Sequence, residues 1–138
     1  MTVQADFYLL NRPGLELEAV LRTLVKKARS AGFRISIITR DADQTEMLDE
    51  ALWQGTGFLP HETLIRGKKT GSPISLAMTT ENLEPLVINL SCKPVSAFAK
   101  LKRVLEIVPN EDHMRQQSRD HYRNYQQLGW QLKMHKIN

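Results

Sequence analysis

The chain of 138 residues has only one cysteine, no long apolar run and no signal-peptide pattern. Its one cysteine, Cys92, cannot form an internal disulfide, which agrees with a reducing cytoplasm. No run of about 18 apolar residues occurs, which excludes a transmembrane helix. The start, MTVQADFYLL, lacks the basic leader and long apolar stretch of a signal peptide. We therefore expect a cytoplasmic globular protein with no membrane contact.

Neither sign of charge dominates the sequence. Nineteen Lys and Arg residues stand against fifteen Asp and Glu residues, so the net charge is only +4. This balance permits acidic partners, but it falls short of the concentrated charge of a dedicated nucleic-acid binder. The hydrophobic fraction of 41% is ordinary. The length fits one domain, residues 1–138, with a core of its own.

Motifs for nucleotide binding and catalysis are also missing. The sequence from Gly67 to Thr70 resembles the end of a phosphate loop, but Glu62 stands where that loop needs glycine. Lys69 also separates Lys68 from the hydroxyl residue. No dinucleotide-type glycine pattern and no nucleophile elbow occurs. We expect no catalytic residues and no cofactor.

The metal-binding residue types are scattered. The four histidines and the cysteine lack the spacing of metal ligands; they are His61, Cys92, His113, His121 and His135. A structural or exposed role is the simpler interpretation of each. We expect no metal site.

Hydrophobic periodicity predicts a layered α/β domain. Short segments rich in β-branched residues predict strands at 3–10, 33–39, 74–78, 86–90 and 103–108. Apolar residues at helical spacing predict helices at 15–31 and 42–53, a short one at 97–102, and a final helix capped by Asn110 and ended by Gly129. Most of 54–73 reads as loop, and 130–138 as a tail that is docked or frayed. The strand–helix alternation favours a parallel sheet.

The final helix carries the most informative surface. Arg115, Arg119 and Arg123 recur at intervals of four residues, which places them on one face with Tyr122 beside them. Guanidinium groups bordered by aromatic and aliphatic groups suit a partner that offers carboxylates and an apolar side chain. A solvated face balanced by nearby acidic residues is the alternative. The residues alone leave both interpretations open.

A second patch, WQGTGFLPH, spans Trp53 to His61. Large apolar residues in a segment with two glycines must either fill the core or lie exposed to a partner. We expect Leu59 to enter the core. For Trp53 and Phe58 the sequence pattern leaves both roles open.

Four segments together resemble the chi subunit family of the bacterial DNA polymerase III holoenzyme over essentially the whole chain. They are FYLL near the start, LDEALW at 48–53, FLPH at 58–61 and VPNEDHMRQQSRDHYRNYQQLGW at 108–130. Their order and separation carry the match, and the last is the most specific. The resemblance implies a single three-layer α/β domain with a mixed, largely parallel sheet, similar to nucleotide-binding folds but without the phosphate loop.

The resemblance also implies a non-catalytic adaptor in DNA replication. Such a protein links the clamp-loader complex, through the psi subunit, to single-stranded DNA-binding protein (SSB), so its contact with DNA is indirect. The SSB end is a short acidic tail that finishes in an apolar residue and a free carboxylate. Positions matching the family's tail-binding patch are Val108, Arg115, Arg119, Tyr122 and Arg123. The resemblance assigns the first two arginines to carboxylates, Val108 and Tyr122 to the pocket wall, and Arg123 to steering.

The family's psi-binding surface corresponds to the second patch. The matching residues are Trp53, Phe58 and Pro60, with Leu59 and His61 beside them. In some relatives this surface serves a helicase that competes with psi. The resemblance therefore favours an exposed position for Trp53 and Phe58.

Two rival functions and one departure from the family pattern accompany this interpretation. The arginine face could bind single-stranded DNA directly, or the sheet could serve a small nucleotide-dependent enzyme.

Asn110 stands where relatives often carry an aromatic residue, which would alter the rim of the tail pocket.

Overall fold

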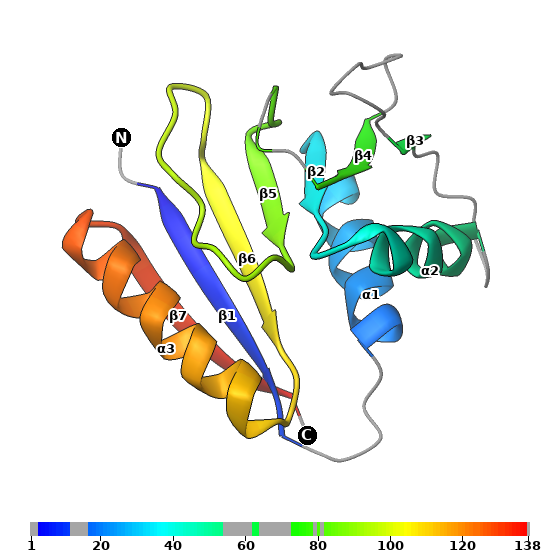
Figure 1. Cartoon of the computed structure of the whole chain (residues 1–138). Coiled ribbons are helices and arrows are strands. Elements are labelled where there is room, and N and C mark those ends of the chain that lie inside the picture. The colour runs from blue at the N-terminus through cyan, green and yellow to red at the C-terminus, as the bar shows by residue number, and fades with distance from the viewer. Residues whose placement is uncertain are drawn as a thin grey trace.

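The structure is a computed structural model that describes residues 3–11, 17–53, 62–63, 73–78, 80 and 82–137. They form an α/β fold in which one sheet lies between helices (Figure 1). The strands are β1 (Gln4–Leu10), β2 (Ile35–Ile38), β3 (Glu62–Thr63), β4 (Ile74–Ala77), β5 (Leu86–Asn89), β6 (Arg103–Val108) and β7 (Gln131–Ile137). The helices are α1 (Leu17–Ser30), α2 (Ala42–Trp53) and α3 (Asp112–Gln127).

The sheet has the strand order β3-β4-β2-β5-β6-β1-β7. Every pairing between the described strands is parallel. Strands of a parallel sheet are joined by crossover connections. α1 lies in the connection from β1 to β2 and α3 in the connection from β6 to β7, and both connections pass over intervening strands. The predicted three-layer α/β fold with a largely parallel sheet is confirmed, and the expected antiparallel component is absent from the described pairings.

The helices cover the sheet from two sides. Leu21 and Val25 of α1 and Leu48 of α2 are buried in one apolar cluster with β2, β4 and β5. Tyr125 of α3 is buried in a second cluster with Phe7 of β1. Figure 1 shows α3 lying along β1 and β7, whereas α1 and α2 lie near β2 and β4. The α3 layer is therefore separated from the α1–α2 layer by the sheet.

Several predicted helix boundaries are confirmed. The Asp41 carboxylate accepts a hydrogen bond from the Gln44 amide at 2.8 Å, as an N-cap of α2 should. This bond is also the main cause of the lowered pKa of Asp41. Gly32 and Gly129 follow α1 and α3 with φ of 87° and 78°, a conformation that glycine adopts without strain.

The predicted cap of α3 is wrong by one residue. Glu111, not Asn110, is the N-cap, because its carbonyl accepts the first helical bond, from the Arg115 amide at 2.9 Å. The Glu111 side chain makes no capping bond. The acidic side chain of Asp112 instead lies in the first turn, where the helix dipole favours it.

The short helix predicted at residues 97–102 does not form. This segment is a turn, in which the Leu101 amide donates to the Phe98 carbonyl at 3.1 Å before β6 begins. Six residues are too few to offset the cost of helix nucleation unless packing supports them. Here the buried residues Val95 and Leu101 anchor an extended segment to the α3 side of the sheet.

The segment after α3 is a strand. β7 pairs with β1 along its whole length, from Gln4 opposite Gln131 to Leu10 opposite Ile137. The docked alternative for residues 130–138 is thus confirmed for 131–137. The loop expected at 54–73 lies almost wholly outside the described residues, apart from β3.

A buried polar network connects α3 to the sheet. The Glu106 carboxylate lies 2.9 Å from His121 Nδ1 and accepts bonds from the Tyr125 hydroxyl at 2.6 Å and the Asn89 amide at 2.8 Å. His121 Nε2 lies 3.2 Å from the Cys92 carbonyl oxygen. Because both ring nitrogens of His121 face acceptors, the imidazole satisfies both only when it is protonated.

The electrostatic surroundings agree with a charged pair. Burial by itself lowers the pKa of His121, but the hydrogen bond and the charge of Glu106 outweigh it and raise the pKa above its ordinary value. Burial and the neighbouring Glu106 charge raise the pKa of Tyr125, so its hydroxyl stays a donor. The network therefore fixes α3 on β6 through a buried ion pair.

A second buried carboxylate connects three adjacent strands. Asp6 of β1 lies 2.7 Å from Arg103 Nε of β6 and 3.0 Å from His135 Nε2 of β7. Burial by itself raises the pKa of Asp6. Its hydrogen bonds to His135, Arg103 and Gln4 together outweigh this effect, so the pKa of Asp6 lies below its ordinary value. This cluster anchors β7 to the rest of the sheet.

The network makes a prediction about stability and pH. The pKa of His121 is about 6.5 when unfolded and higher when folded. Its contribution is therefore complete below about pH 6.5 and is lost as pH rises through the folded pKa. We expect His121→Gln to lower the free energy of unfolding by about 3 kcal/mol near pH 6. The difference from the wild type should shrink at alkaline pH.

Urea unfolding at a series of pH values measures this difference. His113→Gln is the matched control, because His113 is exposed at the start of the same helix. It should change stability by less than about 0.5 kcal/mol. A difference between wild type and His121→Gln that does not change with pH contradicts the ion pair.

Candidate functional site

The orientation of α3 decides where the arginine face points. Ser118, His121 and Tyr125 are the buried residues of the helix and face the sheet. Arg115 and Tyr122 lie on the flank toward β1, since Arg115 contacts Asn11 after β1 and Tyr122 contacts Phe7 within it. The predicted common face of Arg115, Arg119 and Tyr122 therefore borders the β1–β7 end of the sheet.

Arg115 is the most buried of the three arginines on this face. Its Nη2 donates to the Asn11 side-chain oxygen at 3.2 Å. Its Nε is buried and has no hydrogen-bond partner among the described residues. A buried donor without an acceptor is costly, so this guanidinium has unused capacity for an oxygen ligand.

Arg119 and Arg123 are exposed one and two turns further along the helix. Arg119 Nη1 donates to the neutral Gln116 side chain at 3.1 Å. Arg123 lies 3.3 Å from Asp120, with both side chains more than 60% exposed. Such surface pairs contribute little and open readily. Among the described residues, neither Arg115 nor Arg119 forms an ion pair with a carboxylate.

Tyr122 and Val108 lie beside these guanidinium groups at different depths. Tyr122 is half-buried, and its ring packs against Phe7 with centroids 5.5 Å apart. Val108 is only 3% exposed and belongs to the same apolar cluster. Tyr122 is therefore partly accessible beside Phe7, whereas Val108 lies inside the apolar cluster.

The edge strand β7 adds residues that the sequence interpretation missed. Leu132 packs in the α3-side cluster, so alternation along the strand puts Met134 and Lys136 on that side too. Met134 pairs in register with Phe7, the contact of Tyr122, and is 50% exposed. The signal in the sequence was the weak alternation of the apolar Leu132 and Met134 with the polar Gln131, Lys133 and His135.

The second predicted site is only partly described. Trp53 is the last residue of α2, and nothing is described of its side chain. Phe58, Leu59, Pro60 and His61 lie outside the described residues. Figure 1 places the end of α2 across the sheet from α3. The described end of α2 and the arginines of α3 thus belong to different layers.

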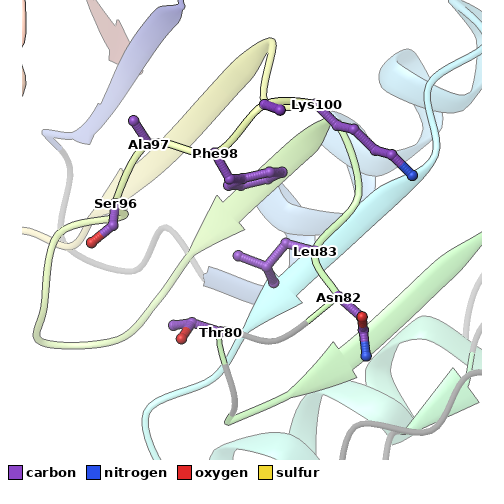
Figure 2. A pocket seen from close by; sticks show the side chains of 8 residues that line it. Thr80, Asn82, Leu83, Ser96, Ala97, Phe98 and Lys100 are labelled. Atoms are coloured by element: carbon purple, nitrogen blue, oxygen red, sulfur yellow. The ribbon is translucent and has the colours of Figure 1, made fainter.

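A hollow of about 410 Å³ opens near the amino ends of β5 and β6 (Figure 2). Figure 2 shows Phe98 and Leu83 pointing toward each other across it, with Lys100 at its rim. None of the predicted binding residues that the structure describes lines it. Its position, at the opposite end of the strands from Asn11 and Val108, separates it from the arginine face.

The carboxyl ends of β5 and β6 are filled by the protein itself. In open α/β sheets the crevice at the carboxyl ends of the strands is where ligands usually bind. Here Asn89, Glu106 and His121 line a cavity of only about 20 Å³. That volume is close to the space of one water molecule. This cavity is too small for a nucleotide.

Within the described residues, no three His, Cys, Asp or Glu side chains come together as a metal ion would need. None of the three described helices combines the length and apolar character required to span a bilayer.

Comparison with known proteins places these features in one family. A family model described as "DNA polymerase III chi subunit, HolC" matches residues 1–133. A Pseudomonas aeruginosa protein named DNA polymerase III subunit chi is 29% identical, covering 97% of this chain and 96% of its own length. An Escherichia coli protein of the same name is 28% identical, with coverage of 93% and 94%.

A third relative with that name, from Haemophilus influenzae, is 26% identical and covers 96% of each chain. The predicted resemblance is therefore confirmed over nearly the whole sequence. The family model covers β1 through the first half of β7, which includes both α3 and the arginine face. The chain belongs to the family of chi subunits of DNA polymerase III, a component of DNA replication.

Proposed function

We propose that this chain is a non-catalytic cytoplasmic adaptor that links the clamp-loader complex, through psi, to the acidic tail of SSB. The observation that carries the proposal is the state of Arg115 and Arg119. Both guanidiniums lack an acidic partner among the described residues, and the Nε of Arg115 is a buried donor without an acceptor. An external carboxylate would give both guanidiniums an acidic partner.

The tail would bind between α3 and β7. Arg119 and Arg115 would take the carboxylates, bidentately where geometry permits, with Arg123 steering the approach. The terminal apolar side chain would pack against Tyr122, supported from inside by the buried Val108. The exposed Met134 of β7 extends this apolar wall, and a flexible Met side chain adapts readily to an aromatic ring.

The exposure of the arginines sets the expected strength. Arg119 and Arg123 are exposed, so their attraction to a charged tail is screened by salt. Most of the specific affinity should then come from the partly buried Arg115 and from apolar contact at Tyr122. We expect modest affinity that decreases as ionic strength rises.

A direct DNA-binding role is the main rival. It would use the same arginine face, and it requires strong binding to bare single strands without SSB. The modest net charge of +4 favours the adaptor. A nucleotide-dependent enzyme is the weaker rival, because the crevice at the carboxyl ends of β5 and β6 has room for about 20 Å³ only.

The psi subunit, or a helicase competing for the same place, would bind the surface that begins at the end of α2. The proposed residues are Trp53, Phe58, Leu59, Pro60 and His61. Support comes from their match to the family pattern and from the position of α2 across the sheet from α3. Partners on opposite layers could bind at the same time, as an adaptor requires.

Arg119→Ala tests the tail site. We expect it to weaken binding of an SSB tail peptide by roughly fivefold, since an exposed ion pair contributes at most about 1 kcal/mol. Thermal stability should be nearly unchanged, because the side chain is exposed. Isothermal titration calorimetry measures the affinity. Lys100→Ala removes the same charge from the distant hollow and should leave binding intact; equal effects of both variants argue against a specific site.

Removing the terminal Phe from the tail peptide tests the apolar wall. The shortened peptide keeps its acidic residues and a free carboxylate, so any remaining binding is electrostatic. We expect calorimetry to detect no binding at physiological salt, because burial of one aromatic side chain contributes about 2 kcal/mol or more. Full affinity of the shortened peptide would disprove the role of Tyr122 and Val108.

Phe58→Ala tests the second surface. We expect weaker association with psi or with the competing helicase in a pull-down titration, while the tail peptide still binds at its wild-type affinity. Arg119→Ala is the reciprocal control and should retain psi. Loss of both partners in the Phe58→Ala variant would indicate misfolding, which circular dichroism would reveal.

A further inference from the structure

The strand β7 lies at the edge of the sheet, and within the described residues it pairs on one side only. The Gln131 amide donates to Val3, and the Ile137 carbonyl accepts from Asn11, so both point inward toward the β1 side. Backbone groups of a strand alternate in direction. The amides and carbonyls of Leu132, Met134 and Lys136 therefore point away from the sheet, and no described strand pairs with them.

The charge around this edge is positive. Lys133 and Lys136 project from opposite faces of β7, and the segment from 131 to 137 contains no acidic residue. The nearby Asp6 carboxylate is buried and lies 3.0 Å from His135 Nε2, so it is not exposed at this edge. An extended segment that pairs here would be favoured by acidic side chains.

A hollow of about 340 Å³ adjoins the same strand on the α1 side. Its lining includes Tyr8, Val20, Leu24, Lys27, His135 and Ile137. The walls are largely aliphatic and aromatic, with Tyr8 stacked on His135 at a centroid distance of 4.6 Å. The ammonium group of Lys27 supplies one positive charge. Such a hollow suits a side chain of the tail that precedes the terminal residue, and Lys27 would favour an acidic group there.

We propose that the acidic tail adds to the free edge of β7 as an extended strand. The inference rests on the proposed function and specifies how that partner binds. Alternate residues of an added strand point to opposite faces. One row would meet Met134 and Arg119 on the α3 side, and the other would enter the hollow between α1 and β7.

A second copy of this chain is the competing occupant. Pairing of two β7 strands would bring Lys133 and Lys136 of one copy against the same residues of the other, and like charges oppose such pairing. Lysine on edge strands commonly prevents this self-association. The acidic side chains of the tail would instead attract Lys133 and Lys136, so charge favours the tail over a second copy of the chain.

Amide hydrogen exchange on the full chain gives a residue-level test. The probe is a synthetic acidic peptide that ends in Phe with a free carboxylate. Saturating peptide should slow exchange at Leu132, Met134 and Lys136 by about tenfold or more. The inward amides of Lys133 and His135 should change little, because they already bond to β1. Protection of the outward amides in the concentrated chain without peptide would assign the edge to a second copy and overturn the proposal.

A pair of substitutions at one position isolates the backbone bond. Lys136→Pro and Lys136→Ala both remove the charge, but only proline removes the outward amide hydrogen. We expect Lys136→Pro to bind the peptide about fivefold more weakly than Lys136→Ala, the size expected for one lost hydrogen bond. Equal affinities of the two variants, both folded by circular dichroism, contradict strand addition.

Filling the hollow tests the second row of contacts. Ala19 is exposed on α1 and lines this cavity. Ala19→Leu should weaken peptide binding by about threefold or more, whereas Ala19→Ser should not. Equal affinities of the two variants overturn that part of the proposal.

The outcomes separate this inference from the proposed function. If the peptide binds and Arg119→Ala weakens it, but the outward amides exchange as before, the tail site stands and strand addition is wrong. If the wild-type chain does not bind the peptide at all, both are wrong. Protection at the three outward amides together with the difference between the Lys136 variants supports strand addition.

Discussion

The bond between Glu106 and His121 is the constraint on which the geometry of the α3 side depends. It joins the middle of α3 to the middle of β6 inside the protein. A buried carboxylate is expensive unless it is paired and hydrogen-bonded, and here three side chains satisfy it. A rotated or shifted helix would leave the charge with Asn89 of β5 as its only partner among these three. The network therefore selects one orientation of α3.

That orientation of α3 places the arginines on the flank of the helix that faces β1 and the edge strand β7. With His121 and Tyr125 facing the sheet, Arg115 and Tyr122 necessarily lie toward β1 and the edge strand. The exposure of the arginine side chains increases along the helix, from the partly buried Arg115 to the exposed Arg123. The surface is composite, because β7 completes the border that α3 begins.

The sequence pattern predicted most of the elements for physical reasons. The strands β2, β4 and β5 are buried at every position, so they read as short apolar runs, and Asp41 marked the start of α2. β7 was harder, because an edge strand with few buried residues has a weak apolar alternation. The residues 97–102 looked helical, but their buried anchors require an extended path.

The candidate site was predictable in part only. The spacing of the arginines was sufficient to place them on one face with Tyr122. The partners inside the protein were not visible, since Glu106 and His121 belong to different elements whose packing no local pattern specifies. For the same reason Met134 was missed, because its place beside Phe7 follows from strand pairing alone.

The sheet also divides the apolar interior into two compartments. Leu21, Leu48 and Ile88 pack on one side, and Phe7, Val104 and Tyr125 on the other, so the two groups share only the strands between them. Energetic effects of changes that touch no common neighbour usually add. Natural selection can thus alter the residues of one layer to suit a changing partner while the opposite layer keeps its own shape.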